Sequence, residues 1–79
     1  MKHEEAKAYV RKHKDYIVLV KWIQGEKTCF VEGSIAGIGL SYPSIVFRIP
    51  EMIDTYYHAE YNFIDLARII QEQKIVVFK

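Results

Sequence analysis

The first segment of the chain places its apolar residues at the period of an α-helix. Between residues 2 and 14, apolar and aromatic side chains recur at helical spacing, and the basic side chains fall mainly on the other surface. This spacing predicts a first amphipathic helix. The positions on the less basic surface are Ala6, Tyr9, Val10 and His13.

A strand and a hairpin loop are predicted next. Residues 16–23 are apolar at both alternating sets of positions, interrupted only by Lys21. Apolar residues on both sets are typical of a strand that is buried on both faces. Residues 24–27 are polar and contain Gly25, which suits the loop of a β-hairpin.

Two further strands follow the hairpin loop. Residues 28–35 alternate between apolar and polar, which places Cys29 toward the interior, although Phe30 breaks the polar set. Glycines and a proline then indicate a loop or a bent strand end over residues 36–44. Residues 45–49 alternate again and predict the third strand.

The C-terminal part is predicted to be mainly helical, with one last strand. Pro50 ends the third strand and suits the first turn of a helix, and whether residues 51–58 are fully helical stays open. Asn62 is placed as the N-cap of a helix with a broad apolar face. Residues 75–78 are apolar throughout and predict a strand inside the sheet.

These elements predict an α+β fold with the order α-β-β-β-α-β over residues 1–79 as a single domain. Short connections favour an antiparallel meander of the first three strands, and the segment 50–74 is long enough for a crossover to a last, parallel strand. The expected sheet is mainly antiparallel and four-stranded, has the spatial order 3-2-1-4, and carries the helices on one face. The residues expected in its core are Val18, Val20, Val31, Phe47, Ile70 and Val77.

Composition narrows the class of protein. The 79 residues are 51% hydrophobic, with 11 basic and 10 acidic side chains, which fits a globular domain and excludes a disordered chain or a tail that binds by charge alone. The longest apolar run is too short to span a membrane, and the first residues do not resemble a signal peptide. A single Cys cannot form an internal disulfide, so we expect a cytoplasmic protein. Because so small a core supplies only about 3 to 5 kcal/mol, oligomerisation or a bound partner is expected.

The glycine cluster at residues 33–39 does not form a phosphate-binding motif. It lacks the ending Gly-Lys-Ser/Thr, and no helix is predicted directly after it, as a dinucleotide-binding loop requires. The favoured interpretation is that these glycines allow a bulge, a bend or a positive φ in a twisted hairpin.

No catalytic or metal motif is found either. The His-x-Glu pattern at His58 superficially resembles that of zinc deaminases, but the partner motif Pro-Cys-x-x-Cys is missing. The three His are dispersed, so none is forced into contact with Cys29 as a base. We therefore expect no enzyme, no cofactor and no metal.

Tyrosines concentrate in the segment before the last helix. Their rings favour interfaces because they bury much area at low entropic cost and keep a polar tip. The alternative, that the rings seal the edge of the core, stays open, and it would move the interface to the sheet face around Thr28, Phe30 and Glu32. The residues predicted to contact a partner are Tyr56, Tyr57 and Tyr61 with Asp54 and Glu60.

Nucleic acid is the alternative partner. The α-β-β-β-α order is similar to that of double-stranded RNA-binding domains, and the first helix has a basic face. The lysine-rich cluster that such domains carry at the start of the final helix is replaced here by Asn62, Phe63, Ile64 and Asp65, where phosphate would be repelled, so nucleic acid is not the expected partner. The basic residues that would bind are Lys7, Arg11, Lys12 and Lys14.

The sequence therefore predicts a small non-enzymatic intracellular protein that binds another protein. A regulatory or inhibitory role and a homodimeric state are open alternatives. A nucleic-acid-binding module that uses the first helix ranks second, and an enzyme with an unrecognised pocket ranks third.

Overall fold

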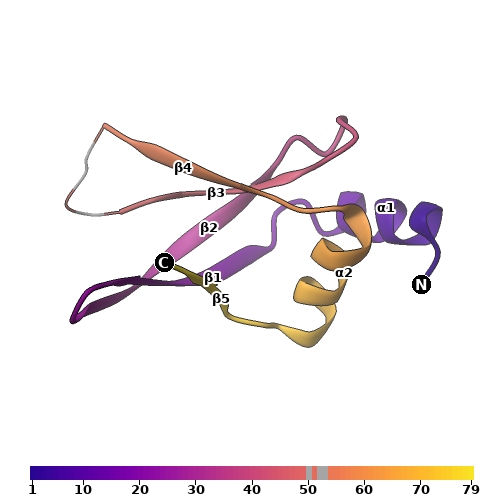
Figure 1. The fold of residues 1–79 in the computed structure, drawn as a ribbon. Helices are drawn as coiled ribbons and strands as arrows, with labels where there is room; N and C mark the ends of the chain where they lie inside the picture. Colours follow the sequence, from indigo (N-terminus) through magenta and orange to yellow (C-terminus); the bar gives the residue numbers. More distant parts are fainter. Residues whose placement is uncertain (50, 52–53) are drawn as a thin grey trace.

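A computed structural model describes residues 1–49, 51 and 54–79, and shows a mixed sheet and two helices within them (Figure 1). The α+β class predicted from the sequence is confirmed. The strands lie side by side in the order β4-β3-β2-β1-β5. In chain order the elements are α1 (His3–Lys12), β1 (Ile17–Gln24), β2 (Lys27–Ala36), β3 (Ser44–Arg48), β4 (Tyr56–Glu60), α2 (Phe63–Glu72) and β5 (Val76–Phe78).

The hairpin between β1 and β2 forms where the sequence predicts it. Gln24 pairs with Lys27, so the loop consists of Gly25 and Glu26. Gly25 has a φ of 59°, whereas Glu26 is not among the residues with positive φ. A glycine at the first central position is the requirement of a type II′ turn, whose twist matches that of the flanking strands.

The pairing of the first and last strands is also as predicted. β1 and β5 are parallel neighbours, with Val20 opposite Val76 and Trp22 opposite Phe78. β2 pairs antiparallel with β1 on one side and with β3 on the other. The order 3-2-1 followed by the last strand is therefore correct.

The expected four-stranded sheet is corrected by a fifth strand. β4 pairs antiparallel with β3 along its whole length, from Arg48 opposite Tyr56 to Ser44 opposite Glu60. Its side chains alternate, so the half-buried Tyr57 and Ala59 face inward between exposed neighbours. This pairing uses the free edge of β3, which a helix could not do. The predicted helix start at Pro50 lies outside the described residues.

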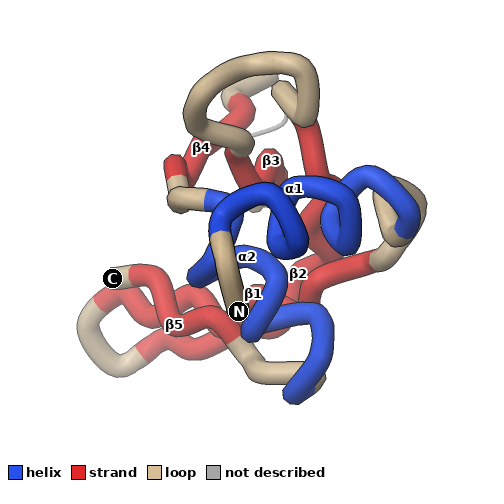
Figure 2. The backbone as a smooth tube through the Cα atoms, turned by 90° about the vertical axis from the view of Figure 1, so that its right-hand side faces the viewer, coloured by secondary structure: helices blue, strands red, loops and turns tan. Residues whose placement is uncertain are grey.

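One face of the sheet carries the core. The buried side chains of β1, β2 and β3 form a single cluster with those of both helices, and five of the six predicted core residues belong to it. Both helices therefore pack on the same side, as Figure 2 shows from the end of the molecule where α1 lies in front. The helical residues in the cluster are Ala6, Val10, Phe63, Leu66, Ala67, Ile69 and Ile70.

Burial on both faces of β1 and β5 is a wrong prediction. In β1 only Val18, Val20 and Trp22 are buried, while Ile17 is 49% exposed. Val77, which was expected in the core, is 53% exposed. The reason is that both helices cover the same face, so no helix or strand among the described residues is left to cover the other.

The sheet curls around its core into a half-barrel. Gly33 lies on the inner face of β2, where a Cβ atom would come within 2.6 Å of Cγ2 of Ile45 and 3.1 Å of Cγ2 of Val20. The missing side chain therefore lets β3 and β1 pack closely on this face. At the end of the sheet away from the helices, three rings fill the curve, from Phe47, Tyr57 and Phe78.

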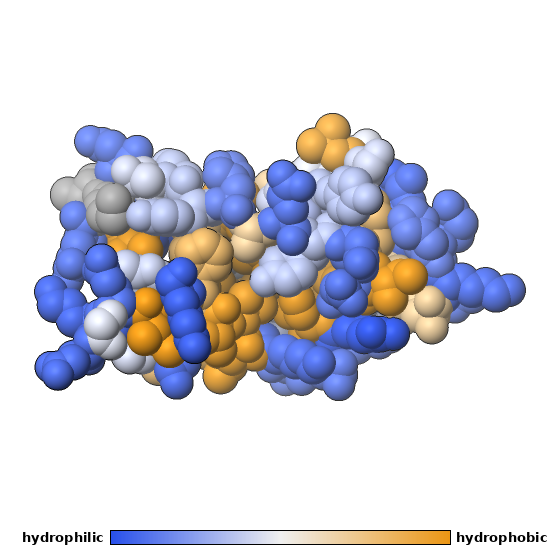
Figure 3. All heavy atoms as spheres, viewed as in Figure 1, coloured by the Kyte–Doolittle hydropathy of each residue, from blue (hydrophilic) through white to orange (hydrophobic). Residues whose placement is uncertain are grey.

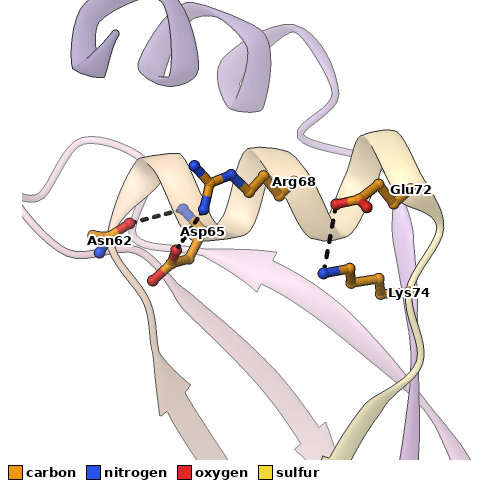
Figure 4. Close-up of polar contacts among 5 residues, drawn as sticks. All are labelled: Asn62, Asp65, Arg68, Glu72 and Lys74. Atoms are coloured by element: carbon orange, nitrogen blue, oxygen red, sulfur yellow. Dashed lines mark hydrogen bonds and ion pairs between the residues drawn. The ribbon is translucent and has the colours of Figure 1, made fainter. Parts of the chain in front are cut away.

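The helix α2 carries the chain from one edge of the sheet to the other (Figure 1). It begins at its predicted N-cap, because the side-chain oxygen of Asn62 accepts a hydrogen bond of 2.7 Å from the backbone N–H of Asp65. Gln73 ends the helix in the left-handed conformation, with a φ of 51°. Figure 4 shows the hydrogen bond of Asn62 together with the ion pairs Asp65–Arg68 and Glu72–Lys74 along the exposed side.

Candidate protein-binding surface

The face of the sheet away from the helices carries a cluster of exposed apolar side chains. In the described residues, nine large hydrophobic side chains are exposed, and five of them come from β1, β2 and the segment of β5. Alternation along the strands directs four of these side chains away from the core face, and the fifth, Ile75, immediately precedes β5. We call them the open-face patch: Ile17, Leu19, Phe30, Ile75 and Val77.

The register of the strands makes this patch continuous. Lys21 is opposite both Phe30 on β2 and Val77 on β5, so it lies between two exposed apolar side chains. Leu19 is opposite Glu32 on β2. Figure 3, drawn in the view of Figure 1, looks onto the side of α2 and shows apolar atoms at the sheet edge formed by β5, while most of the open face is turned away from the viewer. The patch therefore covers neighbouring strands and is not a set of scattered residues.

Two charged side chains interrupt the open-face patch. Lys21 is half-buried and Glu32 is exposed, and neither forms an ion pair with any described residue. Their positions are diagonal, because Lys21 is opposite Phe30 and Glu32 is opposite Leu19. The patch thus combines apolar area with one unpaired charge of each sign.

The three tyrosines of the predicted partner-binding site do not share one surface. Tyr56 is 59% exposed and lies on the open face of β4, as Glu60 does. Tyr57 points to the opposite face, where its ring stacks on Phe47 with 5.7 Å between the ring centres. Asp54 is exposed in the turn before β4.

Tyr61 packs against the core just after β4. Its backbone N–H donates a hydrogen bond of 3.0 Å to the carbonyl oxygen of Pro43, and its ring is half-buried beside the core cluster. Burial raises the pKa of the Tyr61 hydroxyl above its ordinary value of 10.0, because a phenolate would lose hydration there. Tyr57 and Tyr61 therefore contribute to the edge of the core, whereas Tyr56 is available on the surface.

The basic residues of the first helix differ in their surroundings. The ammonium group of Lys7 lies over the ring of Phe63, 5.8 Å from its centre. Nε of Arg11 donates a hydrogen bond of 3.3 Å to the carbonyl oxygen of Ile38. Lys12 and Lys14 are exposed. Two of the four cations are thus already held by contacts within the chain, which reduces the number that could bind phosphate without rearrangement.

The glycine cluster is divided between a strand and a turn. Gly33 belongs to β2, whereas Gly37 lies in a turn and has a φ of 70°. The backbone N–H of Leu40 closes this turn by donating a hydrogen bond of 3.0 Å to the carbonyl oxygen of Gly37. Gly39 borders open space. This arrangement agrees with the interpretation of these glycines as sites of close packing and positive φ.

Pockets and metal-binding clusters are absent from the described residues. These residues enclose no ligand-sized pocket and bring together no group of three His, Cys, Asp or Glu side chains that could hold a metal. Cys29 is half-buried against the core cluster. None of the helices in the described part of the chain combines the length and the apolar character that crossing a bilayer requires.

Most of the open-face patch was missed by the sequence-based site prediction, which named only Phe30 as part of an alternative surface. The signal was present, because residues 16–23 are apolar on both sets of positions. The same pattern fits a strand buried on two sides and a strand with one exposed apolar face, and alternation alone does not separate the two.

Comparisons with known proteins give no match. No protein-family model matches the chain, and neither does any curated protein or any solved structure. The residues and geometry of this chain alone therefore carry its functional assignment.

Proposed function

We propose that this chain is a non-enzymatic protein-binding domain and that it binds through the open-face patch. The observation that supports the proposal is the concentration of five exposed large apolar side chains on one sheet face. Soluble proteins rarely leave a continuous apolar patch on their surface unless it contacts another macromolecule. Scattered exposed apolar residues would carry no such implication.

Phe30 is the expected anchor of the contact. Its ring is 56% exposed and lies next to Lys21 in the middle of the patch. Aromatic rings dominate interface energetics because they bury large apolar areas, each Å² contributing about 25 cal/mol. Tyr56 and Glu60 lie on the same sheet face at the β4 edge, so they extend the surface as part of its polar rim.

The experiment compares two substitutions of exposed apolar residues. The tagged wild-type chain, Phe30→Asp and Leu40→Asp are used to capture proteins from a lysate of the source cells, and the captured complexes are weighed by native mass spectrometry. Leu40 is the matched control, because it is 65% exposed on the loop after β2 and lies outside the patch. We expect the wild type and Leu40→Asp to retain a protein partner that Phe30→Asp loses.

Thermal melting shows whether each variant is folded. Both substitutions replace exposed side chains, so the melting temperatures are expected to stay within a few degrees of the wild type. A folded Phe30→Asp variant that retains every partner of the wild type contradicts the proposal.

A further inference from the structure

We propose that the occupant of the open-face patch is a second copy of this chain, held face to face by a two-fold axis. This inference rests on the proposed function, because it names the partner of the same surface. It is carried by the two unpaired charges within the patch and by their position relative to each other.

Four residues at the centre of the patch form a block with a specific arrangement. Leu19 and Lys21 follow each other on the open face of β1, and they are opposite Glu32 and Phe30 on β2. The two apolar side chains therefore occupy one diagonal of the block, and the two opposite charges occupy the other. Neighbouring positions are about 4.8 Å apart across the strands and roughly 6.6 Å apart along them.

A two-fold axis through the centre of this block makes the charges complementary. When the axis runs along the diagonal from Leu19 to Phe30, it places Lys21 of one copy opposite Glu32 of the second copy. The symmetry repeats the contact, so both charges of both copies gain a partner, as isologous interfaces require. Leu19 and Phe30 cover the neighbouring positions and exclude water from the two ion pairs.

Charge pairing favours a second copy over an unrelated partner. Lys21 and Glu32 have no ion-pair partner among the described residues, and burying an unpaired charge is costly. A second copy supplies both opposite charges at the required spacing without any further assumption. A different protein would have to present the same pattern independently.

The size of the surface sets the strength of the dimer. Strands β1, β2 and β5 have 8, 10 and 3 residues, and with a spacing of about 4.8 Å between strands they give a face of roughly 350 Å² per copy. Because the sheet is curled, the pair then buries at most about 700 Å², which is below the standard interface of roughly 1,600 Å² and corresponds to a weak, reversible complex. We therefore expect dissociation in the micromolar range.

The test uses charge reversal and mixing. Sedimentation velocity of the full chain over a range of concentrations is expected to show a monomer–dimer equilibrium for the wild type. Lys21→Glu and Glu32→Lys each place like charges in both contacts, so each is expected to raise the dissociation constant at least tenfold. Lys14→Glu and Glu26→Lys are the matched controls, because these exposed charges lie outside the block and should leave the dissociation constant unchanged.

Mixing the two reversed chains identifies the contact. When Lys21→Glu is mixed with Glu32→Lys in equal amounts, both intermolecular contacts again join opposite charges. We expect heterodimers with a dissociation constant close to that of the wild type, and the same recovery in the double variant. A mixture that remains monomeric overturns the proposal, because only a contact between chains can be rescued by mixing.

The two proposals can fail separately. A wild type that stays monomeric up to about 1 mM overturns the second-copy inference. If Phe30→Asp then still loses a captured protein of another kind, binding through the open-face patch stands with a different occupant. If Phe30→Asp changes neither the monomer–dimer equilibrium nor the set of captured proteins, both proposals fail.

Discussion

The rings of Tyr57 and Phe78 lie 6.1 Å apart, although they belong to strands at opposite edges of the sheet. Both rings also contact Phe47, with 5.7 Å and 5.0 Å between ring centres. A five-stranded sheet can bring its edge side chains together only if it curls. This ring cluster therefore holds the half-barrel together at the end that the helices do not cover.

Removing one ring is expected to loosen this end of the sheet. Because Phe78 is half-buried, Phe78→Ala should lower the free energy of unfolding by about 2 kcal/mol, measured by urea denaturation. A double-mutant cycle with Tyr57→Ala should give a coupling energy of about 0.5 to 1.5 kcal/mol. Val77→Ala, an exposed change on the same strand, is the control and should cost less than about 0.5 kcal/mol. Strictly additive effects of the two ring substitutions would show that the edges are not coupled.

A side chain at position 33 is expected to lower the stability of the protein. Its Cβ would lie 2.6 Å from Cγ2 of Ile45, so Gly33→Ala should force β2 and β3 apart and cost about 1 to 3 kcal/mol of stability. Gly39→Ala places the same methyl group in open space and should change the melting temperature little. A Gly33→Ala variant as stable as Gly39→Ala would rule out close packing as the reason for this glycine.

The N-cap of α2 is expected to contribute measurably to stability. Asn62→Ala removes the acceptor of the 2.7 Å hydrogen bond and should cost about 1 kcal/mol in urea denaturation, whereas Asn62→Asp should retain most of the stability. Gln71→Ala, an exposed change on the same helix, is the control. An equal loss in Asn62→Ala and Asn62→Asp would mean that the hydrogen bond is not the stabilising feature.

Alkaline pH is expected to destabilise the protein through Tyr61. Burial raises its pKa above 10.0 in the folded state, so between 10.0 and the raised pKa the unfolded chain binds fewer protons than the folded one. Stability therefore falls as the pH rises through this window, and the contribution is fully present below it. Tyr61→Phe should make the decline of the melting temperature above pH 10 shallower, whereas Tyr42→Phe, 60% exposed, should not. An identical decline in both variants would argue against Tyr61 as the group responsible.

Nucleic acid is expected to bind weakly or not at all. Lys7 and Arg11 are engaged within the chain, so we expect no measurable binding of generic duplex or single strands at physiological salt by fluorescence anisotropy. Binding through three or four phosphates would instead show a log-log salt slope of roughly −2 to −4, flattened by changing Lys7, Arg11 and Lys14 to Gln. A sub-micromolar dissociation constant would reverse the order of the two binding hypotheses.

The sequence by itself determined the local elements of this protein. Helical spacing of apolar residues located α1, Asn62 marked the start of α2, and Gly25 marked the hairpin, because each depends on residues near one another in the chain. The parallel pairing of β1 and β5 also followed, since chain direction and connection length restrict it. The five-residue strand β4 was missed because its alternation is too short to stand out from a helix or a loop.

Only the tertiary structure decided which apolar residues are buried. Leu19 and Val20 are neighbours in one apolar run, yet Leu19 is 40% exposed and Val20 is fully buried. The difference arises because both helices cover the face that contains Val20, and the sequence pattern does not state on which side a helix will lie. The same choice separated Tyr56 from Tyr57, and it left the open-face patch exposed, because burial depends on contacts between segments that are distant in the chain.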